Sequence, residues 1–300
     1  MKRTRVFVSL HTRDNDYQVA QALSAEQVAH QLGVDLEIAY ADNDAVHQST
    51  QILGALQKRP ESRPNAIVLE PISNIALPQA AQAACSAGIG WAVLNRVPDY
   101  ISDLRRTATA PMFAVCSHHL EIGRIQGRQF AALLPKGGSI LYLEGPSQSS
   151  SAQERTAGML ETKPPNIQVA TLRGQWTELS AQRAVGSWLK LAALQTTAVN
   201  LIGAQDDSMA MGARKAFQEI ANEQDRARWL RLPFTGCDGL PQTGQVWVRE
   251  GLLVATIHIP PIAGQAIETL LKAMENRTQP AAQVFTQSYS IPPLSALRPG

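Results

Sequence analysis

Cysteine is scarce in this 300-residue chain, which contains only Cys85, Cys116 and Cys237. The three stand far apart, and no Cys-x-x-Cys pair or Cys/His cluster occurs at zinc-binding spacing, which argues against a structural zinc site. An odd number of cysteines cannot form a complete disulfide framework, although one bridge is still open on arithmetic alone. Because Cys85 and Cys237 stand in apolar or strand-like surroundings, we expect buried structural thiols.

Long hydrophobic runs are also missing. No window of about 18 consecutive apolar residues exists, so the sequence predicts no transmembrane helix. The chain begins with the basic segment MKRTR, but the apolar stretch that follows, 6–10, is only five residues long. A secretory signal needs an apolar core of about 7–15 residues, so we expect no export signal in this chain.

A charge excess of either sign is absent, since 27 Lys and Arg residues face 25 Asp and Glu residues and leave a formal net charge of +2. This balance argues against a nucleic-acid groove as the main binding surface. It argues equally against a polybasic membrane anchor.

The common catalytic motifs are missing as well. The sequence has no P-loop, no Gly-x-Gly-x-x-Gly after an expected strand and no Gly-x-Ser-x-Gly elbow. His118 and Glu121 have a helical spacing that could support a metal, but no third ligand accompanies them. We therefore expect a protein that is not an enzyme and that carries no cofactor.

What the chain does have is a repeated alternation of short apolar runs and amphipathic segments. Its length is about twice that of a usual domain, so two domains are expected. In the first half, strands are expected at 6–10, 36–40, 66–69, 91–94 and 113–116, and helices at 19–32, 44–57 and 76–87. The apolar residues expected on the inner faces of the first two helices are Val19, Ala22, Leu23, Ala29 and Leu32, and Val46, Ile52, Leu53 and Leu56. Such apolar strands, each followed by a helix, are typical of a parallel sheet covered on both faces.

The pattern restarts after an expected loop at 96–111. Strands are expected at 139–143, 167–172, 199–202, 234–235 and 253–257, and helices at 121–134, 152–159, 178–194, 207–220, 242–250 and 263–274. The fold class predicted is therefore α/β, with two doubly wound, Rossmann-like units built on parallel sheets.

Polar side chains recur where the expected strands end, which is where open α/β sheets bind ligands. Planar Asp, Asn and Arg side chains can hydrogen-bond vicinal sugar hydroxyls in pairs, and aromatic rings pack on sugar C–H faces. Each such residue taken alone is also compatible with a helix cap or turn. The recurrence at nearly every strand end favours a small polyhydroxylated ligand.

The chain resembles the type I periplasmic sugar-binding proteins, of the ribose/galactose-binding kind that serves ABC transporters. The resemblance covers about residues 6–275. It is carried by QLG at 31–33 with YADND at 40–44, NAIVLEP at 65–71, AGI at 87–89 with VLNR at 93–96, GRIQG at 123–127, RTAGM at 155–159, AQDDSMAMGA at 204–213, GCDG at 236–239 and GLLVATI at 251–257.

The resemblance implies two lobes joined by a three-strand hinge, with the ligand in the cleft. One lobe would take residues 1–116 and about 260–284, and the other about 117–259 and 285–300. The chain would cross near Ser117, Ile259 and Phe285. The ligand-binding residues implied are Asn15, Tyr17, Asn95, Arg96, Arg155, Trp176, Asp206 and Asp238, with Glu70 and Ser117 as second-rank candidates.

Several positions depart from the family pattern. Its common Asn-Pro-Phe-Phe is NDYQ at 15–18, which removes one stacking ring, and its usual Asp before the arginine is Asn95. Asp206 replaces an asparagine, Cys237 an aromatic residue, and Ile259 a hinge glutamine. Glu70, Asp206 and Asp238 together could favour a ligand with a positive group, such as an amino sugar.

The function implied is capture of a monosaccharide or related sugar and its delivery to an ABC permease, by a monomer that binds no nucleic acid. The alternative is a ligand-sensing module for a sensor kinase or a transcriptional regulator. The resemblance points to the periplasm or cell envelope, whereas the expected lack of an export signal leaves the cytoplasm as the alternative.

Overall fold

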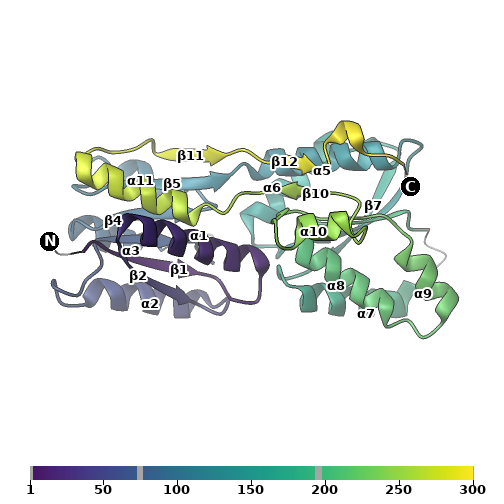
Figure 1. Cartoon of the computed structure of the whole chain (residues 1–300), viewed down its shortest axis with the longest axis horizontal. Helices are drawn as coiled ribbons and strands as arrows, with labels where there is room; N and C mark the ends of the chain where they lie inside the picture. The colour runs from purple at the N-terminus through teal and green to yellow at the C-terminus, as the bar shows by residue number, and fades with distance from the viewer. Residues whose placement is uncertain (1–2, 73–76, 193–197, 300) are drawn as a thin grey trace. The chain divides into compact units, whose positions relative to one another are not determined.

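The computed structural model describes residues 3–72, 77–192 and 198–299 of the chain. Contacts divide it into two compact units: unit 1 is Met1–Ser117 with Pro261–Thr286, and unit 2 is His118–Pro260 with Gln287–Gly300. The chain therefore passes between the units after Ser117, Pro260 and Thr286. Both units have a parallel sheet with helices on its two faces, as the sequence predicted (Figure 1).

Unit 1 is built on a six-stranded, wholly parallel sheet in the order β11-β5-β4-β3-β1-β2. Its elements are β1 (Arg5–Leu10), α1 (Asp16–Leu32), β2 (Asp35–Tyr40), α2 (Ala45–Gln57), β3 (Ala66–Leu69), α3 (Pro78–Ser86), β4 (Gly90–Leu94), α4 (Tyr100–Leu104), β5 (Met112–Ser117), α11 (Ala263–Asn276) and β11 (Gln283–Thr286).

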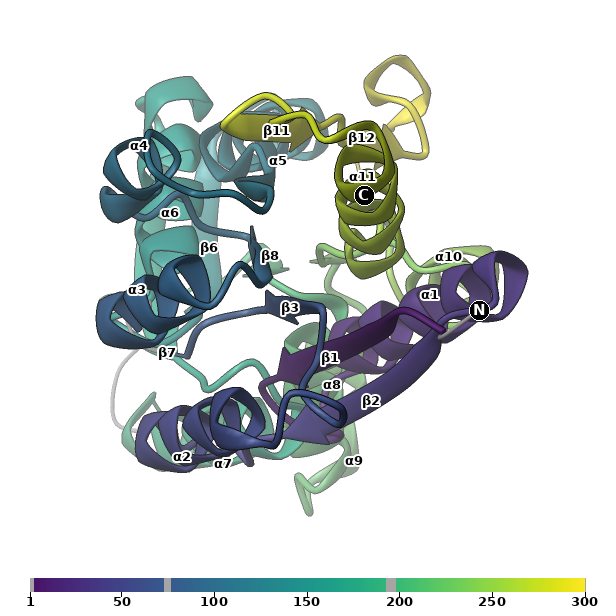
Figure 2. The same ribbon diagram turned by 90° about the vertical axis from the view of Figure 1, so that its left-hand side faces the viewer.

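The strand side chains of unit 1 alternate between two buried layers because successive residues of a strand point to opposite faces. Phe7, Ile67 and Trp91 pack with α2 and α3, whereas Val8 and Val68 pack with α1 and α11. Figure 2 shows these helix pairs on opposite sides of the sheet. All strand ends that precede helices consequently lie at one edge, and this edge positions the candidate site.

Unit 2 has a four-stranded parallel sheet in the order β7-β6-β8-β9 and a small antiparallel pair, β10-β12. Its elements are α5 (His119–Leu133), β6 (Gly138–Glu144), α6 (Ser150–Thr162), β7 (Ile167–Arg173), α7 (Glu178–Ala192), β8 (Leu201–Ala204), α8 (Asp207–Gln218), α9 (Glu223–Leu230), β9 (Phe234–Thr235), α10 (Gly244–Arg249), β10 (Thr256–His258), β12 (Tyr289–Ile291) and the 3-10 helix η1 (Leu294–Ala296).

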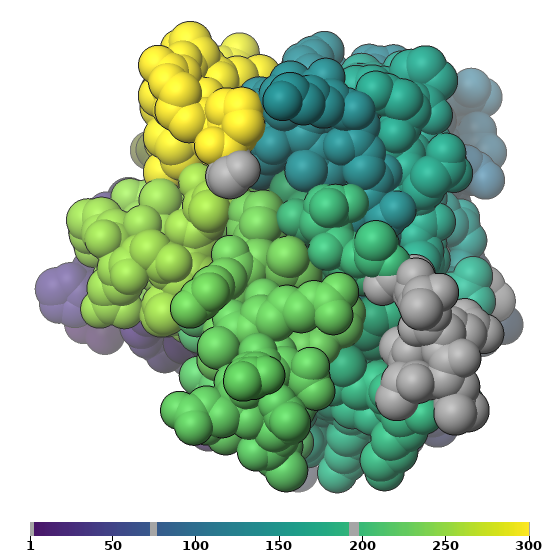
Figure 3. Space-filling view, turned by 90° about the vertical axis from the view of Figure 1, so that its right-hand side faces the viewer, coloured from purple at the N-terminus to yellow at the C-terminus, as the bar shows by residue number. Residues whose placement is uncertain are grey.

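The end of the chain packs onto unit 2. Leu297 is buried in the same cluster as Phe130 and Leu133 of α5, and Leu294 packs against that cluster. Figure 3 shows the C-terminal segment, in yellow, beside the blue-green α5 region. The last segment therefore belongs to the core of unit 2.

The apolar faces predicted for the first two helices are wrong in part. Val19, Leu23 and Leu32 of α1 are 39%, 57% and 49% exposed, and Val46 of α2 is 75% exposed. The buried side of α1 instead consists of amides and small residues, namely Gln18, Gln21, Ala22, Ala25 and Ala29. Small side chains let α1 lie close to its neighbour α11, and Gln21 accepts there from the backbone N–H groups of Ile262 and Ala263, so large apolar residues are left outside.

Other local predictions also needed correction. The expected loop at 96–111 contains the short helix α4, and the helix α9 was not predicted because none of its residues is fully buried. The expected strand at 253–257 lies later, at Thr256–His258, and that at 199–202 lies at Leu201–Ala204. The expected helix start at Ala76 and helix end at Leu194 lie outside the described residues.

Two predictions from composition can be compared directly with the structure. All three cysteines are free and buried. None of the helices in the described ranges combines the length and the apolar character needed to cross a membrane.

Candidate functional site

At the carboxyl edge of the unit 1 sheet, three of the predicted site residues come together. Glu70 follows β3, Asn95 follows β4, and Ser117 ends β5; all three are buried. The Asn95 Nδ2 donates to Glu70 Oε1 at 3.0 Å, and the Ser117 backbone N–H donates to Asn95 Oδ1 at 3.4 Å. Neighbouring parallel strands thus place residues 22 and 25 positions apart in one hydrogen-bonded row.

The start of α1 supplies two further predicted residues. Asn15 is the N-cap, and its side chain accepts a hydrogen bond of 3.0 Å from the Gln18 backbone N–H. Tyr17, in the first turn, is 8% exposed. Arg96 follows Asn95 and is half-buried. Capping holds the Asn15 side chain at the start of α1. An amide has two N–H groups and two lone pairs, so Asn15 can cap the helix and also bond a ligand.

Three glutamines at this edge were missed by the sequence analysis. Gln18 and Gln21 lie on one face of α1, and their Nε2 atoms donate to Glu70 Oε2 at 2.9 and 3.4 Å. Gln48 of α2 donates to the Glu70 carbonyl oxygen at 2.8 Å and to Ser9 Oγ at 3.2 Å. All three are at least 95% buried. The sequence signal available was the three-residue spacing of Gln18 and Gln21, which places both on the same face of a helix.

In unit 2, Arg155 and Trp176 are neighbours. Arg155 lies on α6, is 6% exposed, and has its guanidinium carbon 5.4 Å from the centre of the Trp176 ring. Its Nη1 donates to the Gln205 carbonyl oxygen, and its Nε has no hydrogen-bond partner among the described residues. Gly145 leaves room for the Trp176 ring, which a Cβ at that position would overlap. The pair forms a cationic group beside an aromatic face.

Asp206 and Asp207 stand side by side but have different tasks. Asp206 is the N-cap of α8 and accepts from the Met209 N–H at 2.5 Å. Asp207, which the sequence analysis did not single out, accepts from Thr256 Oγ1 at 2.6 Å and from the Gly239 N–H at 2.8 Å. It therefore ties α8 to the Gly239 turn and to β10.

Asp238 completes the predicted set in unit 2. It is 6% exposed, and its N–H donates to the Ile257 carbonyl oxygen at 2.9 Å. Its φ is 100°, and Asn95 and Trp176 also have positive φ, at 55° and 60°. Asp42, Asn43, Leu77 and Arg277, outside the predicted set, have positive φ as well, so this conformation marks turns in general.

Gln205 is the buried centre of the unit 2 edge, and in the sequence it stood out only as part of the motif at 204–213. Its Oε1 accepts from the Gly145 N–H at 2.9 Å, and its Nε2 donates to the Ala152 carbonyl oxygen at 3.0 Å and to Thr156 Oγ1 at 2.9 Å. With its own carbonyl holding Arg155, Gln205 orders both the loop after β6 and the start of α6.

The buried Tyr142 and Cys237 side chains keep their protons. Burial raises the pKa of the Tyr142 hydroxyl and that of the Cys237 thiol far above their usual values. Tyr142 consequently donates to Gln126 Oε1 at 2.7 Å, and Cys237 Sγ lies 3.6 Å from Gln126 Nε2. A thiol held in this form is a poor nucleophile, so it fits packing better than catalysis.

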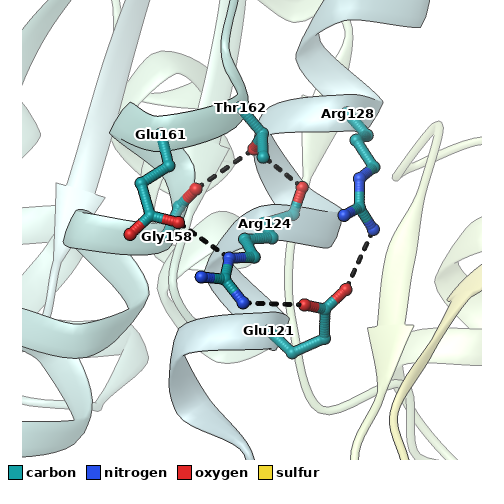
Figure 4. Close-up of polar contacts among 6 residues, drawn as sticks. All are labelled: Glu121, Arg124, Arg128, Gly158, Glu161 and Thr162. Atoms are coloured by element: carbon teal, nitrogen blue, oxygen red, sulfur yellow. Dashed lines mark hydrogen bonds and ion pairs between the residues drawn. The ribbon is translucent and has the colours of Figure 1, made fainter.

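Glu121, which the sequence paired with His118 as a weak metal candidate, lies in a cluster of ion pairs. Glu121 is paired with Arg124 at 3.4 Å and with Arg128 at 2.9 Å, and Arg124 also pairs with Glu161 at 2.7 Å (Figure 4). Within the described residues, no group of three or more His, Cys, Asp or Glu side chains could hold a metal ion. Glu121 is thus part of the ion pairs on the α5–α6 surface.

Comparisons with known proteins place most of the chain in one family. A family model described as a periplasmic binding protein domain matches residues 6–278. The ribose import binding protein RbsB of Escherichia coli (strain K12) is 25% identical over 283 residues, which span 92% of this chain and 86% of RbsB.

Solved structures share the fold. A periplasmic solute-binding protein of an ABC transporter from Actinobacillus succinogenes 130z, with bound D-allose, has a TM-score of 0.81 at 22% identity and covers 96% of this chain and 97% of its own. The fructose-binding periplasmic domain of a hybrid two-component system has a TM-score of 0.77 at 20% identity, covering 96% and 92%. The chain belongs to the family of periplasmic binding proteins, and its two units have the type I fold of that family.

Proposed function

We propose that this protein captures a small polyhydroxylated ligand, a monosaccharide or a related sugar, and delivers it to an ABC permease. The observation that carries the proposal is the set of buried, planar polar side chains at the carboxyl edges of both parallel sheets. These are Asn15 and Asn95 in unit 1, and Arg155, Asp206 and Asp238 in unit 2. The ribose import protein and the D-allose complex among the similar proteins support the same ligand class.

The chemistry of these side chains suits sugar hydroxyls. A guanidinium donates in a fork, a carboxylate accepts in a fork, and an amide does both, so each can bind two vicinal hydroxyls. Tyr17 and Trp176 add aromatic faces for the C–H side of a sugar ring.

The proposed mechanism is a shift between open and closed states. A ligand that takes contacts from both units stabilises the state in which the units close on it, and the three chain passages supply the hinge. No bond of the ligand changes in this scheme. We propose that the protein acts in the periplasm as a monomer, with no cofactor, and that the permease recognises its closed state.

Thermal-shift screening followed by calorimetry tests the ligand class. The panel is D-ribose, D-allose, D-apiose, D-fructose and myo-inositol, with glycine and spermidine as non-sugar controls. A sugar at 100 times its dissociation constant is expected to add about 2.7 kcal/mol to the free energy of unfolding. If no sugar or polyol raises the melting temperature, the proposal is wrong.

Two arginine variants test the site. Arg155→Met removes the buried guanidinium and is expected to weaken sugar binding more than about tenfold, because a charge-assisted hydrogen bond is lost. Arg183→Met removes an exposed charge from α7 in the same unit and is the matched control, expected to leave affinity unchanged. Equal affinities in the two variants would show that Arg155 does not contact the ligand.

The sensing alternative differs in its partner. The fructose-binding domain of the two-component system has the same fold, so fold alone does not separate transport from sensing. Deletion of the gene should abolish uptake of the bound sugar if the protein serves a permease. Intact uptake with loss of sugar-induced transcription would instead assign it to a sensor or regulator.

A further inference from the structure

The carboxylate of Glu70 is surrounded by amides. It is buried, with 8% of its surface exposed, and accepts from Gln18 at 2.9 Å, from Gln21 at 3.4 Å and from Asn95 at 3.0 Å. Within the described residues, these partners of its side-chain oxygens are all neutral N–H donors. A buried carboxylate needs such donors, because burying an ionised group without compensation is costly.

Each of these amides is oriented from both ends. An amide has a donor end and an acceptor end, whereas an ionised carboxylate only accepts and a backbone N–H only donates. Asn95 turns Nδ2 to Glu70 and accepts from the Ser117 N–H with Oδ1. Gln18 turns Nε2 to Glu70 and accepts from the His11 N–H at 3.0 Å. The Glu70 carboxylate therefore determines that Gln18 and Asn95 turn their N–H ends towards it.

Gln21 extends the same arrangement to the start of α11. Its Nε2 faces Glu70, and its Oε1 accepts from the backbone N–H groups of Ile262 and Ala263 at 2.7 and 2.8 Å. No side chain caps this helix from Ile262, its N-cap residue, so Gln21 supplies the missing acceptor. Glu70 consequently orients Asn95, at the carboxyl end of β4, and Gln21, which holds the beginning of α11.

We propose that Glu70 is a positioning residue that fixes the Asn95 amide for an uncharged ligand and does not bind the ligand itself. Asn95 then offers the ligand its second N–H and its second lone pair, a donor and an acceptor that suit a hydroxyl. Three of the roughly four lone-pair sites of the Glu70 carboxylate are taken by amides, and in this scheme Glu70 makes no ion pair with the ligand. This inference rests on the proposed sugar-binding function and narrows its ligand class to neutral sugars and polyols at the unit 1 edge.

Glu70 and Asn95 can exchange a carboxylate for an amide without a change in side-chain length, and this makes the double variant informative. In Glu70→Gln the new amide group confronts N–H donors, so one of the three bonds is lost. In Asn95→Asp two carboxylates face each other at about hydrogen-bond distance and repel. In the double variant the amide introduced at position 70 donates to the carboxylate introduced at position 95, while the Ser117 N–H keeps an acceptor.

The first measurement needs no ligand. Each single variant is expected to lower the melting temperature by about 3–6 °C, and the double variant to recover more than half of the combined loss. Glu37→Gln is the matched control: it removes the same charge from an exposed residue of unit 1 and should shift the melting temperature by less than about 2 °C. If a single variant fails to fold, folding of the double variant counts as recovery. Additive losses in the double variant would overturn the proposal.

The second measurement compares D-allose with 2-amino-2-deoxy-D-allose by calorimetry. The wild-type protein is expected to bind the neutral sugar at least about tenfold more tightly, and Glu70→Gln is expected to change this ratio by less than about threefold. Tighter binding of the amino sugar that disappears in Glu70→Gln would show direct contact and overturn the proposal. If neither sugar binds, the proposed ligand class fails, while the thermal cycle still decides whether Glu70 orients Asn95.

Discussion

The two units hold their candidate ligand residues in different ways. In unit 1 the edge is organised by hydrogen bonds, with Gln18, Gln21 and Asn95 around the Glu70 carboxylate. In unit 2 the Gln205 side chain also bonds the start of α6, but the helix that carries Arg155 is held in addition by close packing against α5. A Cβ at Gly123 would overlap the Arg155 carbonyl oxygen, and one at Gly158 would overlap that of Leu120.

This difference shows that one architecture can position a binding edge by polar bonds or by shape. A hydrogen-bond network is sensitive to the loss of a partner, because a buried polar group is then left unsatisfied. A glycine contact between helices is sensitive to added volume, because backbone atoms cannot move aside as a side chain can. The Glu70 edge of unit 1 is therefore expected to be most sensitive to the loss of a polar partner, and the α5–α6 contact of unit 2 to added volume.

The largest effect is expected from Gly158→Ala in unit 2. The added methyl group would meet the backbone of Leu120 and Arg124, so α5 and α6 would have to separate, at a cost of about 3 kcal/mol in the free energy of unfolding. Urea unfolding measures this loss. A cost below about 1 kcal/mol would mean that shape does not hold this pair of helices.

The next effect is expected from Gln21→Met in unit 1. The substitution keeps the volume but leaves the Ile262 and Ala263 N–H groups without an acceptor, and we expect a loss of about 2–3 kcal/mol by urea unfolding. Gln27→Met, at an exposed position of the same helix, is the control and should change stability by less than about 0.5 kcal/mol. If both variants lose a similar free energy of unfolding, the hydrogen bonds of Gln21 do not hold the start of α11 in unit 1.

A smaller, stabilising effect is expected where glycine has no packing task. Gly54 in α2 and Gly186 in α7 lie in helices, and among the described residues no atom lies within 4 Å of a Cβ built at either position. Alanine there should add about 0.5–1 kcal/mol in each unit, because it lowers the entropy lost on folding. If Gly186→Ala lowers the stability, the space around a glycine does not by itself predict the effect of alanine in unit 2.

The smallest effect concerns the helix caps and pH. Asp44 caps α2 in unit 1 with bonds to the His47 and Val46 N–H groups, and these bonds lower its pKa below the usual Asp value of 3.8. Because the folded-state pKa is lowered, its contribution is complete above pH 3.8 and is lost as the pH falls through the lowered pKa. Ser149 caps α6 in unit 2 with a hydroxyl, which does not titrate.

Melting temperatures measured at pH 7 and at pH 3 or below test this difference. The penalty of Asp44→Ala should shrink on acidification, whereas the penalty of Ser149→Ala should not depend on pH. Equal pH dependence of the two penalties would show that the charge of Asp44 does not contribute to its cap.

Much of the fold could be predicted from short-range patterns. Apolar runs such as 66–69 and 91–94 correspond to the buried strands β3 and β4, and polar residues after them, Glu70 and Asn95, meet at one edge. Parallel strands with intervening helices leave little freedom in this respect, because all their carboxyl ends lie on the same side. The contact of Glu70 with Asn95 follows from that rule.

The buried glutamines could not be found in the same way. Gln21 accepts from residues 241 and 242 positions away, and no local pattern reports such a partner. Counting apolar residues at helical spacing selected Val19 and Leu23 as the inner face of α1, yet both are exposed. Local periodicity assumes that large apolar residues turn inward, and this fails where a helix must approach its neighbour closely.

The sequence alone thus determined the alternation of strands and helices in both units and the meeting of Glu70, Asn95 and Ser117 at one sheet edge, and it favoured buried thiols without excluding a disulfide. Tertiary structure decided which side of α1 is buried and which way each amide at the Glu70 edge points. The reason is physical: strand burial follows from local hydrophobicity, whereas an amide takes its direction from donors and acceptors that distant segments bring to it.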